Sequence, residues 1–569
     1  MRYSIFAAFF CLLAACGGGG SSPGTGSGGG GQGPSAPPPT APEAARLLTQ
    51  GTFGVTEAGI GEVQSQGING WITAQVALPR PGVSHEAYID SALAANGSVN
   101  ANNFYQTWWR QAINEPDQLR QRVTFALSQI FVISLVDPAV DTRGAASWYD
   151  MLQRNAFGNF RTLLEEVTLH PMMGRYLTYL GNQKEDAAGT RTPDENYARE
   201  VMQLMTIGLV ELNADGTPRL NGTEQIPAYT PADIAGLAKV FTGLSWYSTS
   251  PNNTTFAGGN AHSDRSVRPM IFYPDFHSTS AKTFLGTTIP ASTTVDIAGD
   301  LRIALDRLFN HANTGPFIAK RLIQQLVTSN PSPAYVGRVS AVFANNGSGV
   351  RGDLAAVVRA ILTDTEARNI SVATSTSFGK LREPVIRVTN WARSFGATSQ
   401  TGNFLITSTS ANTSLNQSPL ASPSVFNFWR PGFTPPATTQ LGQNMLLAPE
   451  FQVVDEVTTA SYINQMQDWI NAGIGSVPTG GSGRDVRSAY AAEIALADNP
   501  TALVDRMNLL LFYGQMTPTL QTRLNAAITA VTIPAATGSN QAAIDTARLN
   551  RAKTAVFFSM ISPEYLVQR

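Results

Sequence analysis

The stretch RTPDENYAREVMQLMTIGL, residues 191–209, predicts a helical fold. At about 100° per residue, the side chains of Glu195, Asn196, Arg199, Glu200 and Gln203 fall on one side of a helix and cover roughly a third of its circumference. Apolar residues take most of the remainder, so we expect this helix to be buried on most sides. The five polar residues, called here the 195–203 stripe, then face either water or other polar groups inside the protein. Only the second case would form a site.

Helical periodicity continues through most of the chain. The clearest predicted helices cover residues 117–134, 159–169, 191–209, 231–244, 295–311, 316–327, 333–346, 352–364, 501–514 and 543–562. Thr192-Pro193 and Thr230-Pro231 are typical helix starts, with a Thr N-cap, a Pro in the first turn and a carboxylate three residues after the Thr.

A short β excursion interrupts the helices near residues 209–229. Asp215-Gly216 and Asn221-Gly222 are dipeptides that fit tight hairpin turns. The sequence therefore predicts a mainly α fold, with one large multi-helix domain and a small β-hairpin excursion.

The N-terminus predicts export and lipid anchoring. Arg2 is followed by an apolar run, 5–15, that is too short to span a bilayer, so residues 1–15 are expected to be a signal peptide. Leu13-Ala14-Ala15-Cys16 resembles the bacterial lipobox, in which the Cys becomes the lipidated first residue of the mature protein. Residue 17 is Gly and not Asp, and this implies the outer membrane, on its periplasmic or cell-surface side. We therefore expect Cys16 to bind outer-membrane lipid.

The remaining organisation follows from composition. Residues 16–42 comprise the lipidated Cys and a Gly/Ser/Pro-rich tether, 43–395 a main helical domain, 396–448 an irregular Ser/Thr-rich segment, and 449–569 a C-terminal helical part packing on the main domain. The formal net charge is −1 and the chain has no basic run, which gives no electrostatic basis for binding nucleic acid. The two Cys leave no thiol for a disulfide, a nucleophile or a metal site, because Cys11 lies in the signal peptide and Cys16 carries lipid.

Several blocks resemble a known family. They include LRQRVTFALSQIFVIS (119–134), DENYAREVMQLMTIGL (194–209), FHSTSAKTFLG (276–286), the long block 326–364 and KLREPVIR (380–387). In order from residue 44 to about 470, they resemble the bacterial domain-of-unknown-function 1800 family. The resemblance implies a large, mainly helical exported domain, and it implies no activity and no cofactor. Family members are often encoded beside an exported family resembling sulfatases, so the resemblance implies an exported sulfatase-like partner protein.

The histidines and nucleophiles give few local motifs. None of the five His forms a His-x-x-x-His or His-Glu-x-x-His pattern, and many relatives carry His-Asp where this chain has His277-Ser278, so the resemblance gives no metal site of that kind. His170 and His311, at helix ends, are predicted to be structural. His277 lies in an irregular stretch five residues before Lys282, inside a family block, and is a candidate site residue. The chain has no Gly-x-Ser-x-Gly motif, no Walker loop and no Rossmann fingerprint after a strand.

Two interpretations of the 195–203 stripe stay open. It forms a buried ion-pair network, or it lines a pocket. In either case its partners come from the other blocks, where the candidates are Lys184, Asp233, His277, Lys282, Arg382 and Glu383. Residues expected to bind a ligand are Glu195, Asn196, Arg199, Gln203 and Arg382.

The sequence is compatible with three functions. The first is a surface-facing or periplasm-facing binding or assembly component that works with the exported partner. The second is a hydrolase of a polar extracellular substrate, with Glu200 as general base and His277 or Lys282 orienting an oxyanion. The third is an oxygen-ligated metal-binding protein using Glu195, Glu200 and Asp233. The sequence does not decide whether the protein is an enzyme.

Overall fold

Helices make up most of the regular structure. The computed structural model describes residues 37–569, and Pro39–Arg569 form one compact unit. The predicted signal peptide, Cys16 and most of the tether lie outside the described residues. Within residues 37–569, no helix has the length and apolar character needed to cross a membrane.

The first eight helices are α1 (Ala41–Gly51), α2 (Glu57–Ala77), α3 (His85–Asn96), α4 (Ala101–Asn114), α5 (Gln118–Ser128), α6 (Thr142–Asn155), α7 (Phe160–Leu169) and α8 (Pro171–Tyr176). The next are α9 (Asn196–Gln203), α10 (Pro231–Val240), α11 (Asn253–Phe256), α12 (Ile297–Asn310), α13 (Thr314–Leu326), α14 (Pro333–Ala344), α15 (Leu354–Thr363), α16 (Thr365–Arg368) and α17 (Ile370–Ala373). The last are α18 (Pro384–Ser394), α19 (Gln440–Gln443), α20 (Glu456–Ala472), α21 (Ala491–Ala495), α22 (Pro500–Phe512), α23 (Pro518–Ala530), α24 (Gln541–Met560) and α25 (Pro563–Leu566). Two 3-10 helices, η1 (Pro274–Phe276) and η2 (Pro449–Val453), lie between them.

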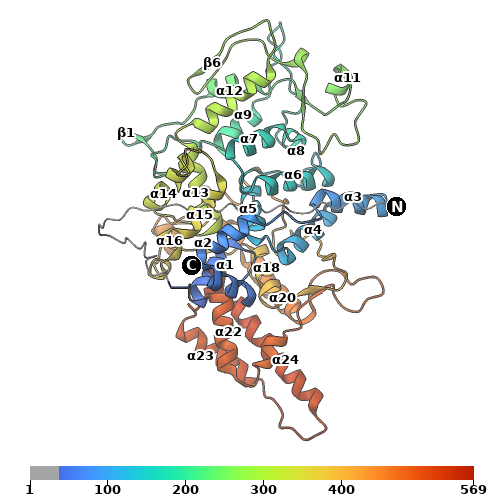
Figure 1. Ribbon diagram of the computed structural model, residues 1–569, viewed down its shortest axis with the longest axis vertical. Helices are drawn as coiled ribbons and strands as arrows, with labels where there is room; N and C mark the ends of the chain where they lie inside the picture. The colour runs from blue at the N-terminus through green and yellow to red at the C-terminus, as the bar shows by residue number, and fades with distance from the viewer. Residues whose placement is uncertain (1–36) are drawn as a thin grey trace, which may run out of the picture. The chain divides into compact units, whose positions relative to one another are not determined.

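The strands are short and pair two by two, all antiparallel. They are β1 (Leu220–Asn221) with β2 (Glu224–Gln225), β3 (Leu244–Ser245) with β4 (Ile271–Phe272), β5 (Lys282–Phe284) with β6 (Thr287–Ile289), β7 (Lys380–Leu381) with β10 (Val567–Gln568), and β8 (Thr398–Ser399) with β9 (Val486–Arg487). The mainly α prediction is confirmed (Figure 1). The hairpin of β1 and β2 is the predicted excursion, and Gly222 turns it with a φ of 66° that favours glycine.

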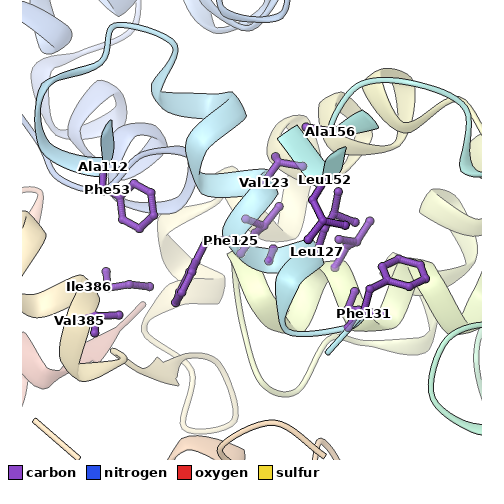
Figure 2. Packing of buried hydrophobic residues seen from close by; sticks show 14 of the residues in the cluster. Phe53, Ala112, Val123, Phe125, Leu127, Phe131, Leu152, Ala156, Val385 and Ile386 are labelled. Atoms are coloured by element: carbon purple, nitrogen blue, oxygen red, sulfur yellow. The ribbon is translucent and has the colours of Figure 1, made fainter. Parts of the chain in front are cut away.

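Helix α5 lies at the centre of the core, because all eleven of its residues are buried. Figure 2 shows Phe125 pointing toward Phe53 and toward Val385 and Ile386 of α18, while Leu127 points toward α6. A helix without a solvent face must pack against neighbours all round, and α5 must also satisfy buried polar side chains such as Arg122 and Thr124 within the protein. The predicted helix 117–134 therefore exists, but it ends at Ser128.

The predicted helix 191–209 is shorter than expected. Helix α9 begins at Asn196, and Glu195 occupies the N-cap position without a capping side-chain bond, so the predicted Thr192 cap is wrong. The backbone of Asp194 instead exchanges hydrogen bonds with the Asn182 side chain, at 2.9 and 3.3 Å, and Thr178 donates to the Asp194 carboxylate at 2.9 Å. These contacts with residues distant in sequence hold 191–195 outside the helix.

The second predicted cap is present. Thr230 accepts a bond from the Asp233 backbone, and the Asp233 carboxylate accepts from the Thr230 backbone, so α10 begins with the predicted capping box. Helix α10 then approaches β5 closely at Gly236, where an added Cβ would lie 1.8 Å from the Thr283 carbonyl oxygen. Gly236 thereby fixes the segment that contains His277 and Lys282 against α10.

Residues 396–448 contain only two short regular elements, β8 and α19, among the described residues. Beyond them, α22, α23 and α24 pack on one another, and α22 also contacts α1 (Figure 1). The division into 43–395, 396–448 and 449–569 stays a prediction.

Candidate functional site

The structure divides the 195–203 stripe into two environments. Glu195 and Arg199 each have 44% of the side chain exposed, and they pair with each other at 3.1 Å. Asn196 donates to the Thr178 hydroxyl at 3.4 Å, and Gln203 accepts from the Tyr229 hydroxyl at 3.4 Å. An exposed pair of this kind stabilises a protein by less than ~1 kcal/mol.

Glu200 lies on the buried side of α9. It is 8% exposed, and its Oε2 atom has no hydrogen-bond partner in the described structure. Burial raises the pKa of Glu200, and the neighbouring Arg199 opposes that shift. None of its hydrogen bonds or ion pairs connects it to His277 or Lys282 in residues 37–569, so the three candidate catalytic residues are not brought together.

His277 and Lys282 meet at a carboxylate that the sequence analysis missed, Asp300 of α12. Asp300 Oδ2 lies 2.9 Å from His277 Nε2 and 2.9 Å from Lys282 Nζ. His277 Nδ1 lies 2.7 Å from the Thr242 carbonyl oxygen, and Lys282 Nζ donates to the Ser278 carbonyl at 2.6 Å. Both ring nitrogens therefore have partners within the protein. The one sequence feature that could have indicated a role for Asp300 is its position, as an Asp, on the apolar side of the predicted helix 295–311.

Two of the three groups proposed for a metal, Asp233 and Glu195, are also occupied. Asp233 accepts from the Thr230 backbone at 2.8 Å and from the Leu285 backbone at 2.6 Å, and Glu195 is paired with Arg199. Over the described range 37–569, no group of three or more His, Cys, Asp or Glu is placed to hold a metal ion.

Two histidines have structural contacts. His170 Nδ1 accepts from the Met172 backbone at 3.2 Å, and His311 Nδ1 accepts from the Asn313 backbone at 3.1 Å. Each therefore caps the segment that follows, where we expected an imidazole to satisfy helix-terminal carbonyls. Burial lowers the pKa of His170 to about 3, so its imidazole is neutral at physiological pH.

Glu383 belongs to a buried charged cluster, called here the Glu383 centre. Its fully buried carboxylate accepts from Gln129 at 2.6 Å and from Gln417 at 2.9 Å. Lys380 Nζ lies 3.1 Å from Glu450 Oε1 and 3.9 Å from Glu383 Oε1. Arg122, also buried, donates to the Gln325 carbonyl at 2.7 Å. The centre comprises Arg122, Gln129, Lys380, Glu383, Gln417 and Glu450.

Arg382, a predicted ligand-binding residue, is 2% exposed. Its guanidinium donates to the carbonyls of Tyr565 and Leu511 and lies 4.5 Å from the centre of the Tyr565 ring. Arg382 thus holds the C-terminal segment against the start of α18.

A mainly apolar cavity of about 260 Å³ lies between the start of α18, helix α20 and the C-terminal segment. The residues that line it include Leu381, Pro384, Arg387, Leu415, Tyr462 and Ile463. Arg387 is 5% exposed, its Nε donates to the Arg382 carbonyl at 2.8 Å, and its guanidinium lies 4.8 Å from the centre of the Tyr462 ring. No carboxylate of the described residues lies within ion-pair distance of Arg387, and burial lowers its pKa.

This cavity combines an apolar wall with one cationic group, which is the usual composition of a small-molecule site. Arg387 is the last residue of the block KLREPVIR (380–387), and the sequence pattern alone assigns it no role. The one sequence feature that could have indicated a site at Arg387 is the presence of a second Arg inside a largely apolar helical block.

Removing one partner of the Glu383 centre leaves buried charges uncompensated. We expect Glu383→Ala to lower the free energy of unfolding by about 3–5 kcal/mol, whereas Glu195→Ala, at the exposed pair with Arg199, lowers it by less than ~1 kcal/mol. Thermal unfolding of both variants, followed by calorimetry, measures the difference. Equal midpoints would show that Glu383 is not a structural centre.

The stability of the protein should also depend on pH through Glu200. Because burial raises its folded-state pKa above the ordinary 4.5, the stabilising contribution is complete below pH 4.5 and is lost as pH rises through the folded pKa. Glu200→Gln stays neutral at every pH, so the variant should gain stability relative to the native chain between pH 4.5 and pH 8. Melting curves of both proteins across this range provide the measurement. A pH-independent difference would place the Glu200 carboxylate in water.

Comparison with known proteins adds the family. No curated protein and no solved structure gives a significant match. A family model described as "Protein of unknown function (DUF1800)" matches residues 46–567, which include α5, α9, the Glu383 centre and the Arg387 cavity. The chain therefore belongs to the DUF1800 family.

Proposed function

We propose that this protein is an exported, lipid-anchored binding component whose folded part takes a small ligand in the cavity at Arg387. The proposed ligand site rests on one observation. Arg387, a residue that is 5% exposed and has no anionic partner among the described residues, lines an apolar cavity of about 260 Å³. A buried charge without an ionic partner lowers stability, so an anionic ligand that pairs with Arg387 would stabilise the folded state. A ligand that reaches Arg387 would supply the missing partner.

The anchor part of the proposal is supported by sequence alone. The signal-like segment 1–15, Cys16 in a lipobox-like context and the tether that follows would place the folded part on the periplasmic or cell-surface side of a bacterial outer membrane. An exported sulfatase-like partner is supported by the family resemblance.

The two alternatives have less support. A general base must lie within hydrogen-bond reach of the groups it serves, and His277 and Lys282 are both bound to Asp300 while Glu200 contacts neither. An oxygen-ligated metal would have to displace Arg199 from Glu195 and the backbone amides from Asp233. The ligand-binding interpretation requires no such rearrangement.

The anchor is tested by fractionation. In a bacterial host, the native chain should partition with the outer membrane, and Cys16→Ala should yield a folded protein in the soluble fraction, because the acyl chains can no longer be attached. Cys11→Ser, inside the predicted signal peptide, should behave as the native chain. Recovery of Cys16→Ala with the outer membrane would contradict the lipobox interpretation.

The cavity is tested with a neutral apolar probe. N-phenyl-1-naphthylamine should fluoresce on binding to the full chain carrying Cys16→Ala, because apolar cavities accept apolar molecules. A further Ile463→Trp change, in the cavity wall, should remove that signal by filling the space.

A matched Trp provides the control for this experiment. Ile303→Trp, at a partly buried position of α12 outside the cavity, should keep the probe signal. If Ile463→Trp and Ile303→Trp bind the probe alike, the proposed ligand site is wrong.

A further inference from the structure

We propose that the ligand of this cavity is a single-chain amphiphile with an anionic head group, of the class of a medium-chain carboxylate, and that the head binds Arg387. This inference rests on the proposed function and names the ligand class of the same site.

The wall of the cavity selects an apolar tail. Leu381, Pro384, Leu415 and Ile463 present aliphatic surface, so a hydrocarbon chain packed against them is taken out of water along this wall. The volume of about 260 Å³ is below the roughly 300–1,000 Å³ of pockets for drug-sized ligands. One short chain therefore fits better than the two chains of a membrane phospholipid.

The geometry of Arg387 selects the head group. Its Nε is used by the Arg382 carbonyl, and the Tyr462 ring fixes the plane of the guanidinium. Among the described residues, its two terminal nitrogens form no hydrogen bond. Two parallel N–H groups on a fixed plane match the two oxygens of a carboxylate, and such a bond to a charged group is stronger than one to a neutral hydroxyl.

No neighbouring carboxylate of the described residues pairs with Arg387 in place of the ligand's head group. Glu383, in the preceding turn, accepts from Gln129 and Gln417 through Oε2, and its Oε1 lies 3.9 Å from Lys380 Nζ and forms no ion pair with Arg387. Arg382 adds a second positive charge whose donors are bound to carbonyls. At the mouth, Val454 is 37% exposed, which leaves an apolar entry for the tail while the head lies deeper, at Arg387.

Another arginine of the same helix, Arg393, has its guanidinium hydrogen-bonded within the protein. Arg393 of α18 donates to the carbonyls of Gly54 and Ile113 and does not line this cavity. It is therefore a matched control for Arg387.

The experiment measures displacement of N-phenyl-1-naphthylamine from the full chain carrying Cys16→Ala. Decanoate should bind about 10- to 100-fold more tightly than 1-decanol, because the carboxylate alone gains the charged hydrogen bonds. Arg387→Gln should reduce this preference to near one while 1-decanol still binds, and Arg393→Gln should keep it. In the absence of the probe, the protein should not co-sediment with phosphatidylglycerol vesicles.

The outcomes separate the two proposals. Equal binding of decanoate and 1-decanol by the native sequence overturns the anionic head group and leaves the ligand site standing. Co-sedimentation with the vesicles, without displacement of the probe by decanoate, overturns the inference in favour of a membrane-binding face. Absence of probe binding altogether overturns the proposed function and this inference together.

A second substitution covers the case in which Arg387→Gln does not fold, as judged by loss of a cooperative thermal transition. Arg387→Lys keeps the charge but loses the planar pair of donors. Its preference for decanoate should fall several-fold and stay above one. An unchanged preference would overturn the role of the guanidinium.

Discussion

The Glu383 centre is the constraint on which the arrangement of the helices depends. A buried carboxylate or ammonium group is tolerated only where partners surround it, because removal from water costs several kcal/mol per ion. Glu383 finds its partners in Gln129 and Gln417, and Lys380 finds Glu450 and the carbonyls of Gln324 and Gln325. Five segments far apart in sequence must therefore meet at one point.

The C-terminus is fixed by the same neighbourhood. Lys380 lies on β7, which pairs with β10, and the Gln568 side chain donates to the carbonyls of Leu326 and Val327 at 2.8 and 3.1 Å. Helix α18 starts directly after Glu383, with Pro384 in its first turn, and one turn later it presents Arg387. The position of Arg387 in the cavity wall thus follows from how the buried charges before it are satisfied.

Local patterns predicted local structure well. Periodicity identified α7, α10 and α12 to α15 within a few residues, and the Thr230 cap was correct because both of its hydrogen bonds join residues three apart. The Thr192 cap had the same local pattern and failed, because Asn182 and Thr178 bind Asp194 more effectively than a helix would. A sequence pattern does not contain such competition from distant residues.

The candidate site shows the same limit for charged residues. Periodicity could place Asp300 on a helix, but it could not pair it with both His277 and Lys282. KLREPVIR contains two arginines, and the sequence offered Arg382 as the ligand-binding one.

What distinguishes the buried cations is the acceptors that the fold gives them. Lys282 has Asp300, Lys380 has Glu450, and Arg382 has two carbonyls, so each contributes to holding the structure together. Arg387 has one carbonyl and the face of an aromatic ring, which leave its terminal donors directed to no protein acceptor. A guanidinium retains a full charge in such a place, since its pKa is too high for deprotonation to relieve the burial. Arg122 also has two unbound nitrogens, Nε and Nη1, but it does not line the cavity. Arg387 is therefore the buried cation of this neighbourhood whose unmet hydrogen-bonding capacity a ligand in the cavity can satisfy.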